Sequence, residues 1–349
     1  MTWLVWRQHR YELLGLVLGG ILIALALVLG TVVATMVREE TDLDKCRPLF
    51  SRESNLCVAL ALEAGNRLQP FRWIVVGLFF LPAIAGSFIG GPLFSREFER
   101  GTQRFAWAQT VTRLRWGSAK LGAVLFAGFL GALAIVLAGS PSRIINGQSP
   151  NPFANFDIEG PAFISYVLFA IALCAFVGTL SRRIITGVFV GLLLFGVVRF
   201  GLMYGLRPNY QPPVTVSYGV NEVERWTQFK MPADAWDFGL DYVDSEGRVV
   251  TSVRVNQLVQ SYEPSSSNPV AWFVVYNSET GKWEPHVPVD IPMARDLRAL
   301  LAADGVFQRV RYQPAERYEL FQWIEATIFL VLSGALVAGT LLLLRKRDA

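Results

Sequence analysis

SREFERGTQRFAWAQTVTRLRWGSAK, residues 95–120, is a basic polar segment between two long hydrophobic runs. Trp107, Val111 and Leu114 fall at positions i, i+4 and i+7, which is the spacing of one helix face. The segment is too short and too polar to cross a bilayer. We therefore expect a short amphipathic helix beneath the bilayer, which can lie against lipid headgroups or dock into a groove on a soluble partner.

The runs on either side of this segment indicate an integral membrane protein. Of the 349 residues, 52% are hydrophobic and 17% charged, against about 25% charged in soluble domains. Six runs have the roughly 17–25 residues that a spanning helix needs. They are Leu13–Met36, Trp73–Phe94, Leu121–Gly139, Gly160–Leu180, Ile184–Leu206 and Trp323–Leu344.

The start of the chain, Met1–Glu12, has two interpretations. Trp3, Trp6, Arg7 and Arg10 stand at helical spacing with aromatic and cationic sides. This pattern fits a short helix lying in the membrane interface, or simply the flank of the first span.

The distribution of Lys and Arg sets the expected orientation. With the N-terminus inside, segments 1–12, 95–120, 181–183 and 345–349 hold thirteen basic residues and four acidic ones. The positive-inside rule then makes both termini and residues 95–120 cytoplasmic in a multi-pass protein of the cell membrane. Because the cations cluster beside hydrophobic runs, we expect membrane lipid and not nucleic acid as their partner.

The expected fold class is an α-helical polytopic membrane protein with six transmembrane helices and a small α+β extracytoplasmic domain between the fifth and sixth. Three parts follow: 1–206 with five spans and the loop 95–120, 207–320 as the outer domain, and 321–349 as the last span and tail. In the outer domain, Val214–Tyr218, Ala271–Tyr276 and Val306–Tyr312 read as strands, Phe238–Val255 as a hairpin and Met293–Ala303 as a helix. The loop Ser140–Glu159 reads as irregular.

Two cysteines, Cys46 and Cys57, fall in the first outer loop. An oxidising compartment allows a disulfide between them, although two free thiols are the alternative. The third, Cys174, lies inside a span.

Two charges fall inside the hydrophobic runs, Arg199 and Glu325. Both lie toward the outer end of their spans and have opposite sign, so we hypothesise an Arg199–Glu325 pair. The alternative is that each reaches the headgroups separately.

Catalytic signals are scarce. The two histidines, His9 and His286, lie on opposite sides of the membrane in the expected topology, and no metal-spaced Cys/His set occurs. The segment Ser278–Trp283 resembles a phosphate loop, but Tyr276 replaces its first Gly and Trp283 its metal-binding Ser or Thr. We expect no metal, no cofactor and no enzymatic activity in this chain.

The loop itself resembles that of a known family. The resemblance rests on the segments Glu97-Phe-Glu-Arg-Gly-Thr102, Gln109-Thr-Val-Thr-Arg113, Trp116 and Ala119-Lys-Leu121. They are similar to the loop after the second span in ABC-2 type ABC transporter permeases. Trp3–Arg10, Tyr312–Tyr318 and Phe321–Glu325 resemble Gram-positive, actinobacterial-like members.

The resemblance implies a permease subunit of an ABC exporter, paired with a second permease chain and with cytoplasmic ATPase subunits that bind ATP and Mg. Residues 95–120 would include the coupling helix that rests on the ATPase. The expected contacts are Glu97, Glu99, Arg100, Gly101, Thr102, Trp107, Val111 and Arg113. The transported substrate would be an amphiphile.

A second class of function stays open. The outer domain could be a membrane-anchored sensor or binding module that relays a conformational change without passing substrate. A membrane enzyme is a third class, disfavoured by the missing catalytic set.

Overall fold

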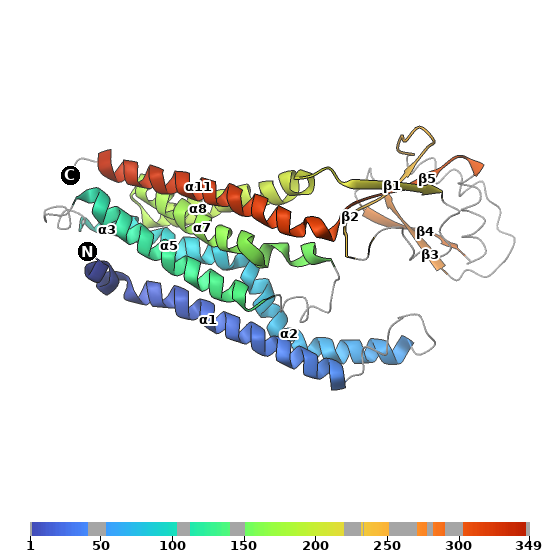
Figure 1. Ribbon diagram of the computed structural model, residues 1–349, viewed down its shortest axis with the longest axis horizontal. Helices are drawn as coiled ribbons and strands as arrows, with labels where there is room; N and C mark the ends of the chain where they lie inside the picture. The colour runs from blue at the N-terminus through green and yellow to red at the C-terminus, as the bar shows by residue number, and fades with distance from the viewer. Residues whose placement is uncertain are drawn as a thin grey trace. The chain divides into compact units, whose positions relative to one another are not determined.

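The computed structural model describes residues 2–40, 54–102, 112–139, 151–219, 232, 234–250, 271–277, 282–289 and 303–346. The chain divides into two compact units. Unit 1 comprises Met1–Tyr210 and Glu316–Ala349, and unit 2 comprises Gln211–Ala315. Unit 1 is helical, and the strands fall in unit 2 (Figure 1).

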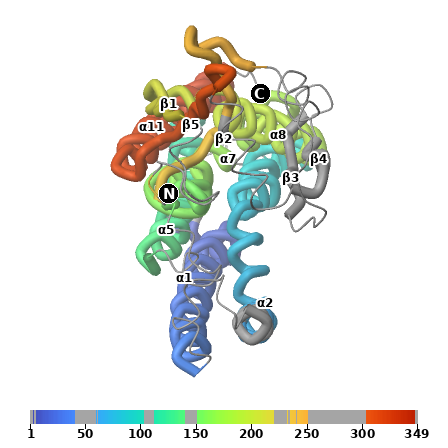
Figure 2. The backbone as a smooth tube through the Cα atoms, turned by 90° about the vertical axis from the view of Figure 1, so that its right-hand side faces the viewer, coloured from blue at the N-terminus to red at the C-terminus, as the bar shows by residue number. Residues whose placement is uncertain are grey.

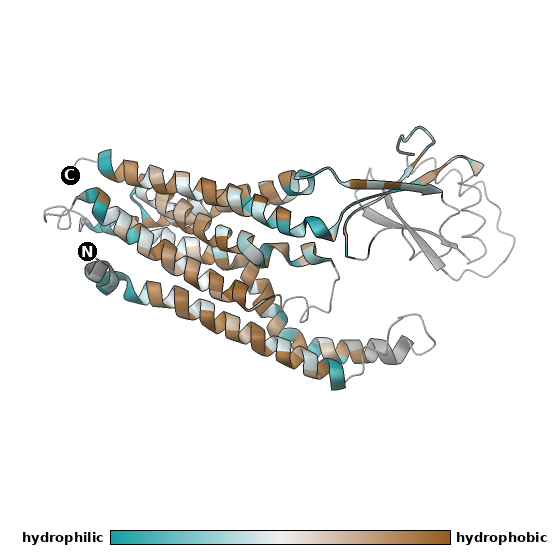
Figure 3. Cartoon of the chain, in the orientation of Figure 1, coloured by the Kyte–Doolittle hydropathy of each residue, from teal (hydrophilic) through white to brown (hydrophobic). Residues whose placement is uncertain are grey.

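Six helical stretches among the described residues are long and apolar enough to cross a membrane, which confirms the six expected spans (Figure 3). The main helices are α1 (Thr2–Glu40), α2 (Ser54–Ala85), α3 (Pro92–Arg100), α5 (Arg113–Leu137), α7 (Gly160–Ser181), α8 (Ile184–Gly201) and α11 (Tyr318–Lys346). Short helical turns are η2 (Gly86–Gly90), η3 (Pro152–Ile158), η4 (Leu202–Leu206), η5 (Arg207–Asn209) and η7 (Ala315–Arg317).

Three helical segments bear on the expectations: the first matches one of the two interpretations given for the start of the chain, and the other two differ from what was expected. Residues 2–12 continue into α1 without a break, so they are the flank of the first span. Helix α2 begins at Ser54, well before the run that starts at Trp73, so part of the expected outer loop is helical. In the expected irregular loop, Pro152–Ile158 forms η3, where Asn151 caps the turn and Phe153 and Phe156 are buried.

Helix α7 is the centre of unit 1, because it packs against α2, α5, α8 and α11. Glycines allow this close approach: a Cβ on Gly86 would lie 2.7 Å from the Ala170 carbonyl oxygen, and one on Gly187 would lie 2.8 Å from the Cα of Gly178. The backbones therefore touch where side chains would separate the helices.

Helix α1 lies along α5, as Figures 1 and 2 both show. At their crossing, a Cβ on Gly20 would overlap the backbone of Gly131, and one on Gly131 would overlap the carbonyl of Leu16. The remaining surface of α1 is largely exposed and apolar.

The described residues of unit 2 form two antiparallel sheets. One has the order β1-β5-β2, from β1 (Val214–Gly219), β5 (Phe307–Gln313) and β2 (Trp236–Val243). The other pairs β3 (Ala271–Asn277) with β4 (Lys282–Val289). Tyr218 of β1 and Val310 of β5 form the centre of a small hydrophobic cluster on these neighbouring strands.

The strands at β1, β3 and β5 match the sequence prediction, and the described part of the expected hairpin, up to residue 250, also turns back on β2. In the turn, the Asp244 carboxylate accepts hydrogen bonds from the Glu246 and Arg248 amides. The chain then returns to β2 through the Val243–Val249 bridge and through a hydrogen bond of 2.8 Å from the Val250 amide to the Tyr242 carbonyl. Strand β2 also pairs with the distant β5, which the sequence did not indicate. The Arg248 side chain holds the pKa of Asp244 below its ordinary value. The helix expected at 293–303 lies almost wholly outside the described residues.

Candidate functional site

Helix α3 carries the start of the loop 95–120 and ends at Arg100. Gly101 adopts φ 68°, in the left-handed region that glycine tolerates, and the Thr102 amide donates to the Glu97 carbonyl at 3.1 Å. This closure is a helix C-cap. It fixes the last turn of α3, which carries Arg96, Glu97 and Glu99.

Five side chains around this turn form what we term the α3–α5 cluster: Glu12, Arg96, Glu97, Glu99 and Lys120. Lys120 of α5 has a side chain that is 0% exposed, and its ammonium donates to Glu97 Oε1. The ammonium also lies 5.0 Å from the centre of the Trp116 ring. A buried ammonium needs such partners because desolvation penalises an unpaired charge.

Glu99 caps another helix. Its Oε1 accepts a hydrogen bond of 2.8 Å from the amide of Ile184, the first residue of α8. The α7–α8 turn is tight, with Arg182 at φ 58°, and Arg183 supplies no side-chain cap of its own. The Glu99 carboxylate therefore satisfies a helix N-terminus from a different element, where the helix dipole favours negative charge.

Glu12 links α1 to the same turn. Its Oε1 accepts from Arg96 at 3.1 Å, while its Oε2 bonds to His9 on its own helix. The three carboxylates of the cluster thus bond to groups on α1, α3, α5 and α8. They tie the last turn of α3 to three other helices, α1, α5 and α8.

A second group, the Arg207 cluster, comprises Asp157, Tyr166, Arg199, Arg207 and Glu325. Glu325 is fully buried and bonds to Arg207 through both oxygens, at 2.8 Å from Nε and 2.7 Å from Nη2. Arg207 also holds Asp157 in a bidentate contact at 2.7 and 3.1 Å. The Tyr166 hydroxyl donates to Glu325 at 2.6 Å.

The structure gives the two members of the hypothesised pair different partners. Glu325 is held by Arg207, whereas Arg199 donates to the Phe79 carbonyl at 3.0 Å and lies 3.8 Å from the Asp157 carboxylate. The guanidinium also faces the rings of Phe79 and Tyr166, at 4.2 and 4.6 Å. The partner of Glu325 is therefore Arg207 and not Arg199. The helical path continues past Gly201 through η4 and η5, and this brings Arg207 to Glu325.

A family model described as ABC-2 membrane transporter related matches residues 14–207, more than half of the chain. The chain belongs to the ABC-2 membrane transporter related family. No curated protein and no solved structure matches it. The resemblance drawn from the loop is therefore confirmed at the level of the family, and the protein is a multi-pass membrane component of transport.

The range matched by the ABC-2 family model contains four of the five residues of the α3–α5 cluster, but not Glu12, Glu325 or unit 2. Among the expected ATPase contacts, Arg100 and Thr102 are exposed, and Arg113 opens α5 behind the Thr112 cap. Glu97 and Glu99 instead bond within the bundle. Trp107 and Val111 of the expected amphipathic stripe lie outside the described residues, whereas its third residue, Leu114, belongs to α5.

Sequence reasoning missed three residues of the α3–α5 cluster, Glu12, Arg96 and Lys120. It also missed the Ile184 amide as the partner of Glu99. The signal for Lys120 was its position at the boundary of a hydrophobic run, one turn after Trp116. Nothing in the local sequence indicates the contact between Glu99 and Ile184, because it joins segments 85 residues apart.

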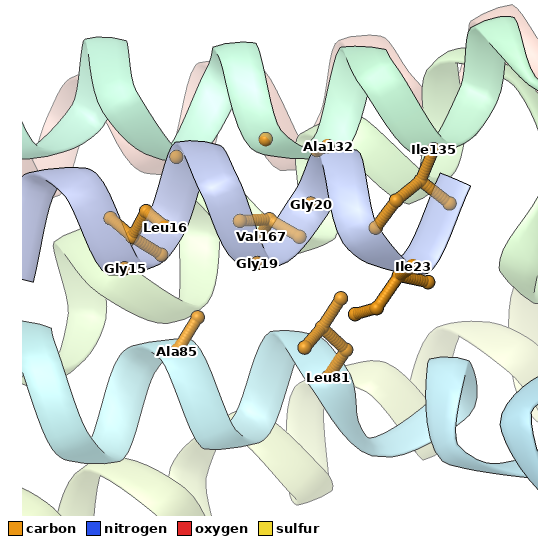
Figure 4. A pocket seen from close by; sticks show the side chains of 12 residues that line it. Gly15, Leu16, Gly19, Gly20, Ile23, Leu81, Ala85, Ala132, Ile135 and Val167 are labelled. Atoms are coloured by element: carbon orange, nitrogen blue, oxygen red, sulfur yellow. The ribbon is translucent and has the colours of Figure 1, made fainter. Parts of the chain in front are cut away.

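A small apolar cavity lies between α1, α2, α5 and α7 (Figure 4). Its volume is about 90 Å³, and its walls include Gly15 and Gly19 of α1, Leu81 and Ala85 of α2, and Val167 of α7. A Cβ added to Gly15 or Gly19 would meet no atom within 4 Å. The packing of α1 against α2 is therefore looser here than at the Gly20–Gly131 crossing.

No group of three or more His, Cys, Asp or Glu that could hold a metal occurs within the described part of the chain. Cys174 is a free, buried thiol on α7. The predicted disulfide cannot be placed, because Cys46 and the Cys57 side chain lie outside what the structure describes.

Proposed function

We propose that this chain is the permease subunit of an ATP-driven ABC exporter. A separate cytoplasmic ATPase, which binds ATP and Mg, would drive movement of an amphiphilic substrate across or out of the cell membrane. Two permease chains, identical or homologous, would share the work, with both termini and the loop 95–120 in the cytoplasm. The chain itself would perform no catalysis.

The α3–α5 cluster carries this proposal. A force on the loop would reach α5 through Glu97–Lys120, α8 through Glu99 and the Ile184 amide, and α1 through Arg96–Glu12. Such contacts move helices together because packed cores are bistable and resist gradual deformation. Arg100 and Thr102, which are exposed on the same turn, are proposed as the docking contacts.

The experiment is co-expression of the chain with its ATPase, followed by purification and reconstitution. We expect Arg100→Glu to weaken the complex. We expect Glu99→Ala to leave the complex intact but to lower transport per ATP hydrolysed. Glu99→Gln is the matched control, because its amide oxygen still accepts from the Ile184 amide. The proposal fails if the chain purifies without any ATPase. It also fails if Arg100→Glu leaves the complex at full strength and Glu99→Ala leaves transport per ATP unchanged.

The alternative function is a conformational relay, and the observation that favours it is that unit 2 is compact in itself. A relay would respond to ATP hydrolysis with a change in unit 2 while no amphiphile crosses the bilayer. Reconstituted vesicles separate the two, since only an exporter transfers a labelled amphiphile between leaflets or into the medium.

A further inference from the structure

The exposed face of α1 changes character along its length. Trp3, Arg7, Arg10, Leu14, Leu18, Ile21 and Leu25 follow one another at steps of four and three residues, so they form one continuous stripe. Every member is exposed, from 38% at Leu14 to 66% at Trp3 among the apolar and aromatic ones. The stripe is aromatic and cationic at its start and purely aliphatic afterwards.

No acidic residue belongs to the cationic part of the stripe. The neighbouring Glu12 is occupied on another side of the helix by His9 and Arg96. The Arg7 guanidinium lies 5.4 Å from the Trp3 ring, and that of Arg10 lies 4.7 Å from the Tyr11 ring. Aromatic rings beside arginines are typical of the headgroup layer of a bilayer.

The dimensions of the stripe fit a phospholipid. Arg7 and Arg10 are separated by about 4.5 Å along the helix axis, so both forks can reach one phosphate. Leu14 to Leu25 extend for about 16 Å, roughly half of the ~30 Å hydrocarbon core, which is the length of one leaflet. The aliphatic stripe thus begins where a headgroup would end.

We propose that this face of α1, defined by Trp3, Arg7, Arg10, Leu14, Leu18 and Leu25, is a binding site for one anionic phospholipid. Arg7 and Arg10 hold the phosphate and negative headgroup, Trp3 and Tyr11 flank it, and an acyl chain lies along the leucines. The charge complementarity and the continuous aliphatic stripe both select a lipid over a soluble anion. The inference does not depend on the proposed ATPase partner.

The test is titration of the full-length chain in detergent with phosphatidylglycerol or phosphatidylcholine, read by native mass spectrometry. The wild type should bind phosphatidylglycerol more tightly. The Arg7→Gln/Arg10→Gln variant should lose about 30-fold in that affinity, since each such cation near an anionic surface contributes roughly fivefold. The Arg345→Gln/Lys346→Gln variant removes two exposed cations at the end of α11 and should keep full affinity.

Three results would overturn the site. The first is an absence of selectivity, seen either as equal affinity of the wild type for the two lipids or as equal affinity of the wild type and the Arg7→Gln/Arg10→Gln variant for phosphatidylglycerol. The second is displacement of bound phosphatidylglycerol by inorganic phosphate, which would make the site one for a free anion. The third is efficient disulfide crosslinking of Leu18→Cys chains in phosphatidylglycerol vesicles, which would place a second copy on this face. Retained affinity in Arg7→Lys/Arg10→Lys would support charge recognition.

Discussion

The two partners of the Glu97–Lys120 pair differ in their exposure to water. The Lys120 side chain is 0% exposed, whereas Glu97 is 19% exposed and can reach water. Removing Glu97 leaves a buried ammonium without its counterion, and breaking a buried pair in this way costs about 3–5 kcal/mol. Removing Lys120 leaves a carboxylate that can hydrate.

We therefore predict that Glu97→Gln destabilises unit 1 by about 3 kcal/mol and that Lys120→Met costs clearly less. Thermal unfolding of the purified variants in detergent measures both. The Lys120→Met/Glu97→Gln double variant should be more stable than Glu97→Gln alone. Equal losses in the two single variants would contradict the asymmetry.

The Arg207 cluster allows a second comparison between residues. Glu325 contacts Arg207, so the effects of changing the two residues should not be additive. We predict that the double variant Arg207→Gln/Glu325→Gln loses less stability than the sum of the losses in the two single variants, by about 1–3 kcal/mol. Arg199 has its own partners, Phe79 and Asp157, so Arg199→Gln/Glu325→Gln should be closer to additive. Stronger coupling for Arg199 than for Arg207 would restore the pairing expected from the sequence.

At the level of elements, the contact of α1 with α5 differs between two adjacent glycines. Gly20 meets the Gly131 backbone, whereas Gly19 faces the cavity beside α2. We predict that Gly20→Ala costs about 2 kcal/mol, because an overpacked contact must separate the helices. Gly19→Ala should be neutral or stabilising by up to about 1 kcal/mol through helix propensity. The same unfolding assay measures both, and a similar loss in the two variants would show that α1 does not cross α5 here.

The elements also show which features the sequence can predict. Unbroken apolar runs predict spans because a charge in lipid is costly, and alternation predicts the strands at β1 and β5. Neither rule identifies the distant partner of a strand, so the sequence predicted the local turn after β2 but not the pairing of β2 with β5. Likewise, Arg207 follows the end of an apolar run, and only the turns η4 and η5 bring it to Glu325.

At the scale of the whole molecule, the chain enters and leaves unit 2 through two neighbouring strands. Strands β1 and β5 are neighbours, and Val214 at the start of β1 pairs with Tyr312 near the end of β5. Directly paired residues in an antiparallel sheet lie about 5 Å apart. Unit 2 is therefore inserted at two points that a short linker can join.

We predict that replacing residues 214–312 with a short Gly-Ser linker leaves unit 1 folded, as judged by size-exclusion chromatography and by a melting temperature within about 5 °C of the full chain. The reason is that the cores of the two units lie within separate compact bodies. An exporter whose spans carry the substrate should then retain association with its ATPase and some transfer of amphiphile in vesicles. A relay would retain the ATPase complex and lose every response outside the membrane. Because the α3–α5 cluster is untouched by the deletion, loss of the ATPase complex would contradict the proposal that this cluster and its loop form the coupling site.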